Sequence, residues 1–407
     1  MTAPHTAGLV RFSPFDRLRD CVAPDLPSGF SFEPSTLRPS RRWSVPEWSR
    51  HVHILITGVC GFVGSTLARA VRQSHPDWQV TGLDNLCRPG SWVNLAPLRE
   101  LDVRVIHGDL RSAADVEALP AADWVVDAAA NPSVLAGVDG KTSPRQLVEH
   151  NLQGTVNILE YCRQRAAGLV LLSTSRVYSI PGLTALKLDV QDSAFCPVAE
   201  QRFPPGISVR GVSESYSTAT PVSLYGSTKI ASECLALEYG STYGFPVWVN
   251  RCGVMAGAGQ FGHPGQGIFA FWVHAFREKR SLRYIGFGGT GHQVRDCLHP
   301  MDLLPLLDKQ FAAGLDAAKP RIINVSGGIE SSCSLRQLTA WCEERFGPDP
   351  VVPSAEERPY DIPWLVLDAA KAADVWGWRP ALSLDAILEE IAGFAERHPQ
   401  WLSVSLG

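Results

Sequence analysis

Residues 52–64 read VHILITGVCGFVG, and this stretch decides the fold. Residues 52–56 form a short apolar run that stops at Thr57-Gly58, and residues 62–74 then carry a helical pattern. A strand that passes through a glycine-rich turn directly into a helix is typical of the first half of a βαβ unit. The stretch therefore predicts the start of an α/β sheet.

The same alternation continues along the chain. Short apolar runs predict further strands at 79–84, 103–107, 124–128, 168–173 and 246–250, and helical stretches include 143–166 and 225–242. Strands that alternate with helices form right-handed βαβ units, and strands buried on both faces of a sheet are continuous apolar runs. We expect an α/β fold with a Rossmann-type, doubly wound parallel sheet and a smaller C-terminal lobe.

Two irregular segments suggest how the chain is divided. Residues 179–222 and 253–300 are rich in glycine, proline or serine, and each follows a strand at the end where open α/β sheets bind ligands. We expect residues 51–178 with 223–252 to form the Rossmann domain. Residues 179–222 with 253–400 are expected to form the smaller lobe, with some segments returning to the sheet. Residues 1–50 show no sustained periodicity and are predicted to be a mobile N-terminal extension.

Composition argues against several classes of protein. Lys plus Arg is 37 and Asp plus Glu is 41, so the net charge of −4 disfavours a nucleic-acid binder. No run of about 18 apolar residues predicts a membrane span. The ten cysteines form no CxxC pair and no zinc-like spacing with histidine, so we expect no metal site. Scattered single cysteines favour reduced thiols in a cytoplasmic protein.

The glycine-rich turn indicates a dinucleotide site. Gly58, Gly61 and Gly64 follow a GxxGxxG spacing, which lets backbone approach a pyrophosphate at a helix N-terminus. Asp84 ends the second strand, where a carboxylate accepts the ribose hydroxyls of NAD and repels the extra phosphate of NADP. Asp109 is placed to meet the adenine, although it is equally suited to cap the next helix. The expected NAD-binding set is Gly58, Gly61, Phe62, Val63, Gly64, Asp84, Asn85, Asp109, Leu110, Ala129, Asn151, Tyr225 and Lys229.

Tyr225 and Lys229 form a YxxxK pair on a predicted helix. Positions i and i+4 share a helix face, so the lysine is expected to lie beside the phenol and favour its ionised form. Such a tyrosine can serve as an acid and base near neutral pH. Thr174, at the carboxyl end of the fifth strand, is expected to reach the same substrate oxygen. The predicted catalytic set is Thr174, Tyr225 and Lys229.

Together these motifs resemble the extended short-chain dehydrogenase/reductase superfamily over roughly residues 52–400. Two C-terminal strings add to the likeness: residues 322–328 resemble the FNxGGG strand, and residues 368–380 resemble the DxxKAxxxxGWxP segment. The nucleotide-sugar epimerases and dehydratases are the most similar group. The resemblance implies a nucleotide-sugar-binding lobe, a nucleotide-sugar substrate, and a homo-oligomer whose interface the sequence does not locate.

The resemblance also implies residue roles. Residues 151–155 resemble the NxxGT helix, whose asparagine supports the cofactor end of the site, and Arg295-Asp296 resembles the RD pair that closes on the diphosphate. An ordinary ion pair between Arg295 and Asp296 is the alternative. The implied substrate-binding set is Arg251, Gln260, Gln266 and Arg295.

Local strings resemble the branch of the family that inverts C2 of CDP-paratose. They include DNLCRPG at 84–90 and GHQVRDCLH at 291–299. Dehydratases of the family usually carry Asp-Glu where this chain has Ser175-Arg176, which disfavours 4,6-dehydration. The sequence departs from the branch at residues 127–131, 175–176 and 255–257, near the expected sugar. Inversion of C4 in a UDP-hexose and a non-catalytic NAD-binding sensor remain the alternatives.

Overall fold

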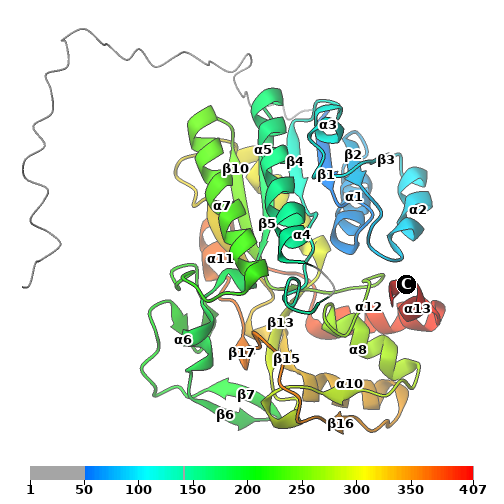
Figure 1. Cartoon of the computed structure of the whole chain (residues 1–407), viewed down its shortest axis with the longest axis vertical. Helices are drawn as coiled ribbons and strands as arrows, with labels where there is room; N and C mark the ends of the chain where they lie inside the picture. The colour runs from blue at the N-terminus through cyan, green and yellow to red at the C-terminus, as the bar shows by residue number, and fades with distance from the viewer. Residues whose placement is uncertain (1–50, 141–142, 407) are drawn as a thin grey trace, which may run out of the picture. The chain divides into compact units, whose positions relative to one another are not determined.

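The computed structural model describes residues 51–140 and 143–406, so the predicted extension at 1–50 lies outside the described residues. A seven-stranded sheet has the order β14-β10-β5-β4-β1-β2-β3, and every neighbouring pair is parallel (Figure 1). The strands are β1 (His53–Thr57), β2 (Gln79–Asp84), β3 (Arg104–His107), β4 (Trp124–Asp127), β5 (Gly168–Thr174), β10 (Val247–Cys252) and β14 (Ile322–Val325). The predicted doubly wound α/β fold is confirmed.

The position of β1 explains where a ligand can enter the sheet. Its register aligns Thr57 with Leu83 of β2 on one side and with Asp127 of β4 on the other. The strand order therefore reverses beside β1, and open α/β sheets bind ligands at such switch points. The turn that follows Thr57 opens at this crevice and leads into helix α1 (Phe62–Ser74).

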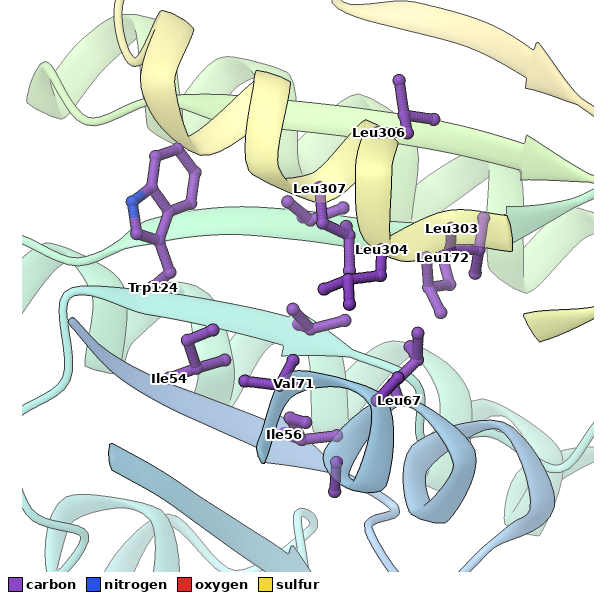
Figure 2. Packing of buried hydrophobic residues seen from close by; sticks show 14 of the residues in the cluster. Ile54, Ile56, Leu67, Val71, Trp124, Leu172, Leu303, Leu304, Leu306 and Leu307 are labelled. Atoms are coloured by element: carbon purple, nitrogen blue, oxygen red, sulfur yellow. The ribbon is translucent and has the colours of Figure 1, made fainter. Parts of the chain in front are cut away.

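Apolar side chains of β1 pack on both faces of the sheet. Ile54 and Ile56 point into one core, with α1 and the segment of η5 (Pro300–Leu303) and α9 (Leu304–Ala313), as Figure 2 shows. Leu55, between them, belongs to the core on the opposite face, where α5 (Gly154–Arg165) and α7 (Leu224–Tyr243) pack. The three central residues of β1 are all apolar because the strand is buried on both faces of the sheet.

The predicted helix at 143–166 is not continuous. It consists of α4 (Pro144–Val148), a π-helical turn η2 (Glu149–Gln153), and α5. Single π turns inside helices are frequent at functional sites. Here the turn contains Asn151, which is 3 % exposed. The helices α5 and α7 lie side by side (Figure 1).

The remaining elements build the smaller lobe. A mixed sheet joins β13 to β11, β15 and β17, and its core is formed by α8, α10 and α12. The elements are α6 (Ile180–Thr184), β6 (Leu188–Gln191), β7 (Ala194–Pro197), β8 (Ile207–Ser208), β9 (Gly211–Val212), β11 (Val254–Met255), α8 (Ile268–Arg277), β12 (Arg283–Tyr284), β13 (Val294–Leu298), β15 (Ser332–Ser334), α10 (Leu335–Phe346), β16 (Val352–Pro353), β17 (Trp364–Leu365), α11 (Ala370–Trp376), α12 (Leu384–Arg397) and α13 (Trp401–Leu406). Strand β14 and helix α9 return to the main sheet, while the predicted domain limits stay a prediction.

Short helical segments connect the larger elements in both parts of the fold. These are η1 (Ser91–Asn94), α2 (Leu95–Glu100), α3 (Ala113–Glu117), η3 (Ser175–Val177), η4 (Phe287–Gly289) and η6 (Ile329–Ser331). Within the described residues, no helix is long and apolar enough to cross a membrane. The same residues hold no cluster of three or more His, Cys, Asp and Glu side chains that could bind a metal ion.

Candidate active site

A cavity of about 630 Å³ lies at the carboxyl ends of the sheet strands and extends into the smaller lobe. Residues that end or follow six of the seven strands line it: Gly58, Asp84, Gly108, Ala129, Thr174 and Cys252. From the smaller lobe, α8, β12 and the start of α10 contribute to the wall. One cavity therefore connects the glycine-rich turn with both lobes.

The glycine-rich turn is packed too tightly for side chains. A Cβ on Gly64 would stand 2.2 Å from the carbonyl oxygen of Gly58, and one on Gly58 would stand 3.0 Å from the Cα of Ala129. Gly58 also has φ +63°, which favours glycine. No side chain caps the start of α1, so its first amide groups face the cavity unpaired. This arrangement suits a pyrophosphate.

Asp84 supports the turn as well as lining the cavity. One carboxylate oxygen accepts the amide of Cys60 at 2.8 Å, and the other accepts the amide of Leu86 at 2.8 Å. Burial raises the pKa of Asp84, and these amide bonds oppose the rise. The side chain is 9 % exposed, at the end of β2 where a ribose is expected.

Asn85 and Asp109 lie together at the same end of the cavity. The Asn85 amide donates to Asp109 at 3.0 Å, and Arg111 donates to both oxygens of Asp109. These bonds hold the pKa of Asp109 well below its usual range. The alternative reading of Asp109 as a helix cap is wrong, because Ser112 caps α3 by accepting the amide of Asp115.

Tyr225 and Thr174 meet as predicted. Ser223 caps α7 by accepting the amide of Gly226 at 3.1 Å, which places Tyr225 in the first turn. The Tyr225 phenol is hydrogen-bonded to the Thr174 side chain and is 7 % exposed. Burial raises the pKa of Tyr225 to about 12, and the Thr174 bond opposes this rise.

The role expected for Lys229 in the ionisation of Tyr225 stays a prediction. Lys229 lines the cavity and is 3 % exposed, but its charge faces the buried carboxylates of Asp127 and Glu233. Burial lowers the pKa of Lys229, and the two carboxylates oppose that fall. The two carboxylates thus favour the charged form of the lysine inside the protein.

Asn151 acts behind the cavity rather than in its wall. Its side chain accepts the amide of Asn131 at 2.8 Å and donates to the carbonyl of Asn131 at 3.1 Å. It also donates to the Thr228 hydroxyl at 3.2 Å. The π turn thereby connects the loop after β4 with α7, which fixes the chain on both sides of the cofactor end of the cavity.

Arg295 and Asp296 point to opposite sides of β13. Arg295 lines the cavity and pairs with Asp361 at 2.8 Å. Asp296 is 1 % exposed and accepts the Ser326 hydroxyl and, at 2.9 Å, the amide of Leu367. The alternative of an ion pair between the two neighbours is therefore wrong, because adjacent strand residues face opposite ways.

Gln260 and Gln266 line the cavity as expected. Gln260 donates to the carbonyl of Met255 at 2.7 Å, and Gln266 accepts Arg88 at 2.8 Å. Arg88 also donates to the carbonyl of Phe261 at 2.6 Å. A single arginine after β2 therefore fastens the 260–267 loop over the cofactor half of the cavity.

The prediction that Arg251 binds substrate is contradicted. Arg251 lies within β10, is 6 % exposed, and is not among the residues that line the cavity. Its guanidinium pairs with Glu233 at 2.6 Å and donates to the Tyr178 hydroxyl at 3.4 Å. Glu233 also accepts the Ser173 hydroxyl at 2.5 Å. The arginine is held in a buried network behind the site.

Each of the three departures from the resembled branch has residues in the cavity wall, among them Ala128, Ala129 and Ala130 of the first. Asp127 and Ala256 are buried and do not line the cavity, whereas Ser175, Arg176 and Met255 do. Asp127 was expected near the sugar, but its carboxylate accepts a hydrogen bond from the hydroxyl of Thr57, at the start of the glycine-rich turn.

The sequence reasoning gave no binding role to three charged residues of the cavity. Arg176, Arg358 and Asp361 all line it, close to Arg295. Arg176 was recognised only as a departure. Arg358 and Asp361 sit between β16 and β17, in no motif, and only the folded chain brings them here.

The fold and this cavity are those of a dinucleotide-binding α/β protein. Its site combines a Tyr-Lys pair with the hydroxyl of Thr174. The model of the NAD dependent epimerase/dehydratase family matches residues 54–326, and the chain belongs to that family. NAD is accordingly its cofactor, and the protein is an enzyme of this type.

Curated relatives are similar over most of their length. CDP-paratose 2-epimerase of Salmonella typhi is 30 % identical over 347 residues, which cover 81 % of this chain and 95 % of the relative. dTDP-glucose 4,6-dehydratase of Streptomyces antibioticus is 28 % identical over 365 residues, covering 86 % and 94 %.

Solved structures share the fold. The UDP-glucuronic acid 4-epimerase of Bacillus cereus, in complex with UDP-glucuronic acid and NAD, aligns with a TM-score of 0.68 at 23 % identity, covering 85 % of this chain and 99 % of the other. The dTDP-glucose 4,6-dehydratase of Bacillus anthracis, in complex with NAD, has a TM-score of 0.64 at 20 % identity, covering 87 % and 99 %.

Proposed function

We propose that the protein inverts one carbon of a nucleotide sugar by oxidising it transiently to a keto sugar and reducing it again. The observation that carries this proposal is one continuous cavity. It is lined by the glycine-rich turn, by the Tyr225–Thr174 pair and by Arg295. A dinucleotide and a second, phosphorylated ligand fit such a space with their reactive ends meeting at Tyr225.

The residues present fit NAD. The turn has no room for Cβ atoms where a pyrophosphate would approach, and the start of α1 presents unpaired amide groups. Asp84 would accept hydrogen bonds from the hydroxyls of the adenosine ribose. Asn85 and Asp109 would flank the adenine, and Lys229 would hold the nicotinamide ribose. When bound, NAD accepts a hydride from the sugar carbon and later returns it.

Residues of the chain transfer the proton of the sugar hydroxyl. Tyr225, as phenolate, takes the proton from the sugar hydroxyl as the C–H bond of that carbon breaks. Thr174 donates a hydrogen bond to the same oxygen and stabilises the charge that develops there. On the return, Tyr225 gives the proton back to the oxygen while hydride reaches the opposite face of the carbon.

Arginines are suited to hold the nucleotide while the sugar turns. Arg295 and Arg358 line the cavity, and Asp361 offsets one of their charges. A guanidinium fork donates two hydrogen bonds to phosphate oxygens at once. A grip on the diphosphate alone leaves the keto sugar free to present its second face.

The positions of the acidic side chains in the cavity favour inversion over dehydration. Among the described residues that line it, the carboxylates are Asp84, Asp109 and Asp361. The first two lie at the adenosine end, and Asp361 is paired with Arg295. Expulsion of a C6 hydroxyl as water needs a carboxylic acid beside the sugar. Ser175 and Arg176 stand where the dehydratases usually carry that acid.

For the sugar, we favour CDP-paratose and CDP-tyvelose, interconverted at C2. The support is the likeness to the Salmonella typhi enzyme and the string GHQVRDCLH, which supplies Arg295. Inversion of C4 in a UDP-hexose is the second candidate, since it needs the same acid-base set and one of the similar folds is a UDP-sugar 4-epimerase.

A panel of nucleotide sugars tests the proposal. The pure protein is incubated with CDP-, UDP- and dTDP-linked hexoses, and epimer formation is followed by NMR. We expect a C2 epimer from CDP-paratose or CDP-tyvelose. Tyr225→Phe should keep bound NAD and lose turnover. NAD binding without turnover of any sugar would instead support a non-catalytic sensor.

A further inference from the structure

The 260–267 loop is a short hairpin that forms part of the cavity wall. Its backbone pairs His263 with Gln266, whose amide and carbonyl groups exchange two hydrogen bonds of 2.9 Å. The residues of the loop that line the cavity are Gln260, Phe261, Pro264, Gly265, Gln266 and Gly267. The position of this hairpin therefore helps to set the shape of the cavity.

Two arginines that line the cavity are attached to this loop. Arg88, which follows β2, donates to the carbonyl of Phe261 at 2.6 Å. Arg358, between β16 and β17, donates to the carbonyl of Gly265 at 3.0 Å. Arg88 lies in the cofactor half of the cavity, and Arg358 is one of the arginines proposed to hold the diphosphate. A shift of the loop would therefore move a cation beside each of the two expected ligands.

Trp401 fixes the loop from behind. This residue, on α13, is 8 % exposed and does not line the cavity. Its indole N–H donates to the carbonyl of Gln260 at 2.8 Å, and its ring stacks on Phe261, with centroids 5.3 Å apart and planes at 20°. Phe394 of α12 meets the same indole edge-on at 4.9 Å. The indole is thus held in one orientation by a hydrogen bond and by two rings, and it holds the loop in turn.

The same aromatic cluster reaches the glycine-rich turn. Phe62, Phe261 and Trp401 form one buried group, and Val63 and Met255 pack against it. Phe62 begins α1, and both Phe62 and Phe261 line the cavity. Trp401 is therefore packed in a group that joins the start of α1, where NAD is expected to bind, to the hairpin.

We propose that Trp401 is a positioning residue, which holds the 260–267 loop against the cavity and thereby retains NAD and orients Arg358 for the sugar nucleotide. The part of this inference that concerns the sugar nucleotide rests on the proposed function. Because Trp401 does not line the cavity, its loss should change the binding of both ligands more than it changes the chemical step.

The exchange of bound NAD tests this without turnover. The purified protein, with its bound NAD, is mixed with an excess of NAD that carries ¹⁴C in the adenine ring. The label that enters the protein fraction is followed by rapid gel filtration. Trp401→Phe keeps a ring for the stack but loses the N–H donor, and we expect NAD release to be roughly threefold faster. Trp401→Leu loses both contacts, and release should be about tenfold faster.

Trp378→Phe is the matched control. Trp378 is 3 % exposed and donates its indole N–H to the carbonyl of Asp302 at 2.7 Å, so phenylalanine removes the same kind of bond. Trp378 does not line the cavity and packs in the core of the main sheet. We expect this variant to lose thermal stability, as Trp401→Phe does, and to release NAD at the parent rate.

Kinetics with the sugar nucleotide give a second readout. In Trp401→Leu, KM should rise about tenfold while kcat changes by less than about threefold, because the hydrogen bond between Tyr225 and Thr174 does not involve the loop. Parent NAD release and parent KM in both Trp401 variants would overturn the inference, as would an equally fast release from Trp378→Phe. Faster NAD release from the Trp401 variants of a protein that turns over no nucleotide sugar would support the inference for NAD and refute the proposed function alone.

Discussion

The hydroxyl of Thr57 donates a 2.6 Å hydrogen bond to the carboxylate of Asp127. This bond joins the end of β1 to the end of β4, at the point where the strand order of the sheet reverses. Thr57 in turn accepts the amides of Ala128 and Ala129, each at 3.0 Å. The carboxylate that holds the cofactor turn in place is therefore the same one that faces Lys229.

Asp127→Asn separates these two roles. The amide keeps an acceptor for Thr57 but removes a negative charge that raises the pKa of Lys229. The pKa of Lys229 should fall further, so the alkaline limb of the activity profile should move to lower pH, by roughly one unit. The profile of kcat/KM against pH measures this, with Asp189→Asn, an exposed site on β6, as the control. A limb that stays in place would show that Asp127 has no electrostatic role.

Thr174→Ala should lower kcat by roughly 10²-fold, because the developing charge on the sugar oxygen loses a donor. Thr174→Ser keeps the hydroxyl and should retain most activity. Since Thr174 also accepts the amide of Arg176 at 3.2 Å, thermal unfolding of both variants is compared with the parent. Equal activity in the alanine and serine variants would contradict a role for the hydroxyl.

NAD, not NADP, should be recovered from the protein. An epimerase returns the hydride that it takes and has no need to release the coenzyme between turnovers. Asp84 repels a 2′-phosphate at the end of β2. The measurement is chromatography of the nucleotide released from heat-denatured protein. Recovery of NADP would refute the role given to Asp84.

Arg251→Ala should destabilise the fold rather than weaken substrate binding specifically. It leaves Glu233 buried without its partner, a loss of about 3–5 kcal/mol in the free energy of unfolding. Arg251→Met with Glu233→Leu removes both charges and should recover part of that loss. Urea unfolding gives the free energies, and KM is measured well below the unfolding range. A raised KM with unchanged stability would restore the substrate-binding prediction.

Much of this architecture could be predicted from local patterns. The apolar run at 52–56, the glycine spacing and the helix at 62–74 are local features, and each recurs in the structure with limits that differ by a residue at most. Thr174 ends β5 and Tyr225 lies in the first turn of α7, the helix that precedes β10. They meet because helices that connect parallel strands begin at the carboxyl edge of the sheet.

The failures concern partners distant in sequence. An arginine at the end of a strand resembles a ligand-binding residue, but Glu233, on a helix that packs against that strand, holds Arg251 inside. Asp361 and Arg358 lie in a loop without any motif and reach the cavity only through the packing of the smaller lobe.

The most direct test of hydride return is the reaction in deuterated water. The pure protein is supplied with CDP-paratose or CDP-tyvelose, and the product is analysed by NMR and mass spectrometry. Hydride that leaves a carbon and returns to the same carbon does not exchange with solvent, so we predict the C2 epimer with no deuterium at C2. Deuterium at the inverted carbon would mean that a proton was abstracted from carbon, and it would contradict the oxidation and reduction assigned to Tyr225 and NAD.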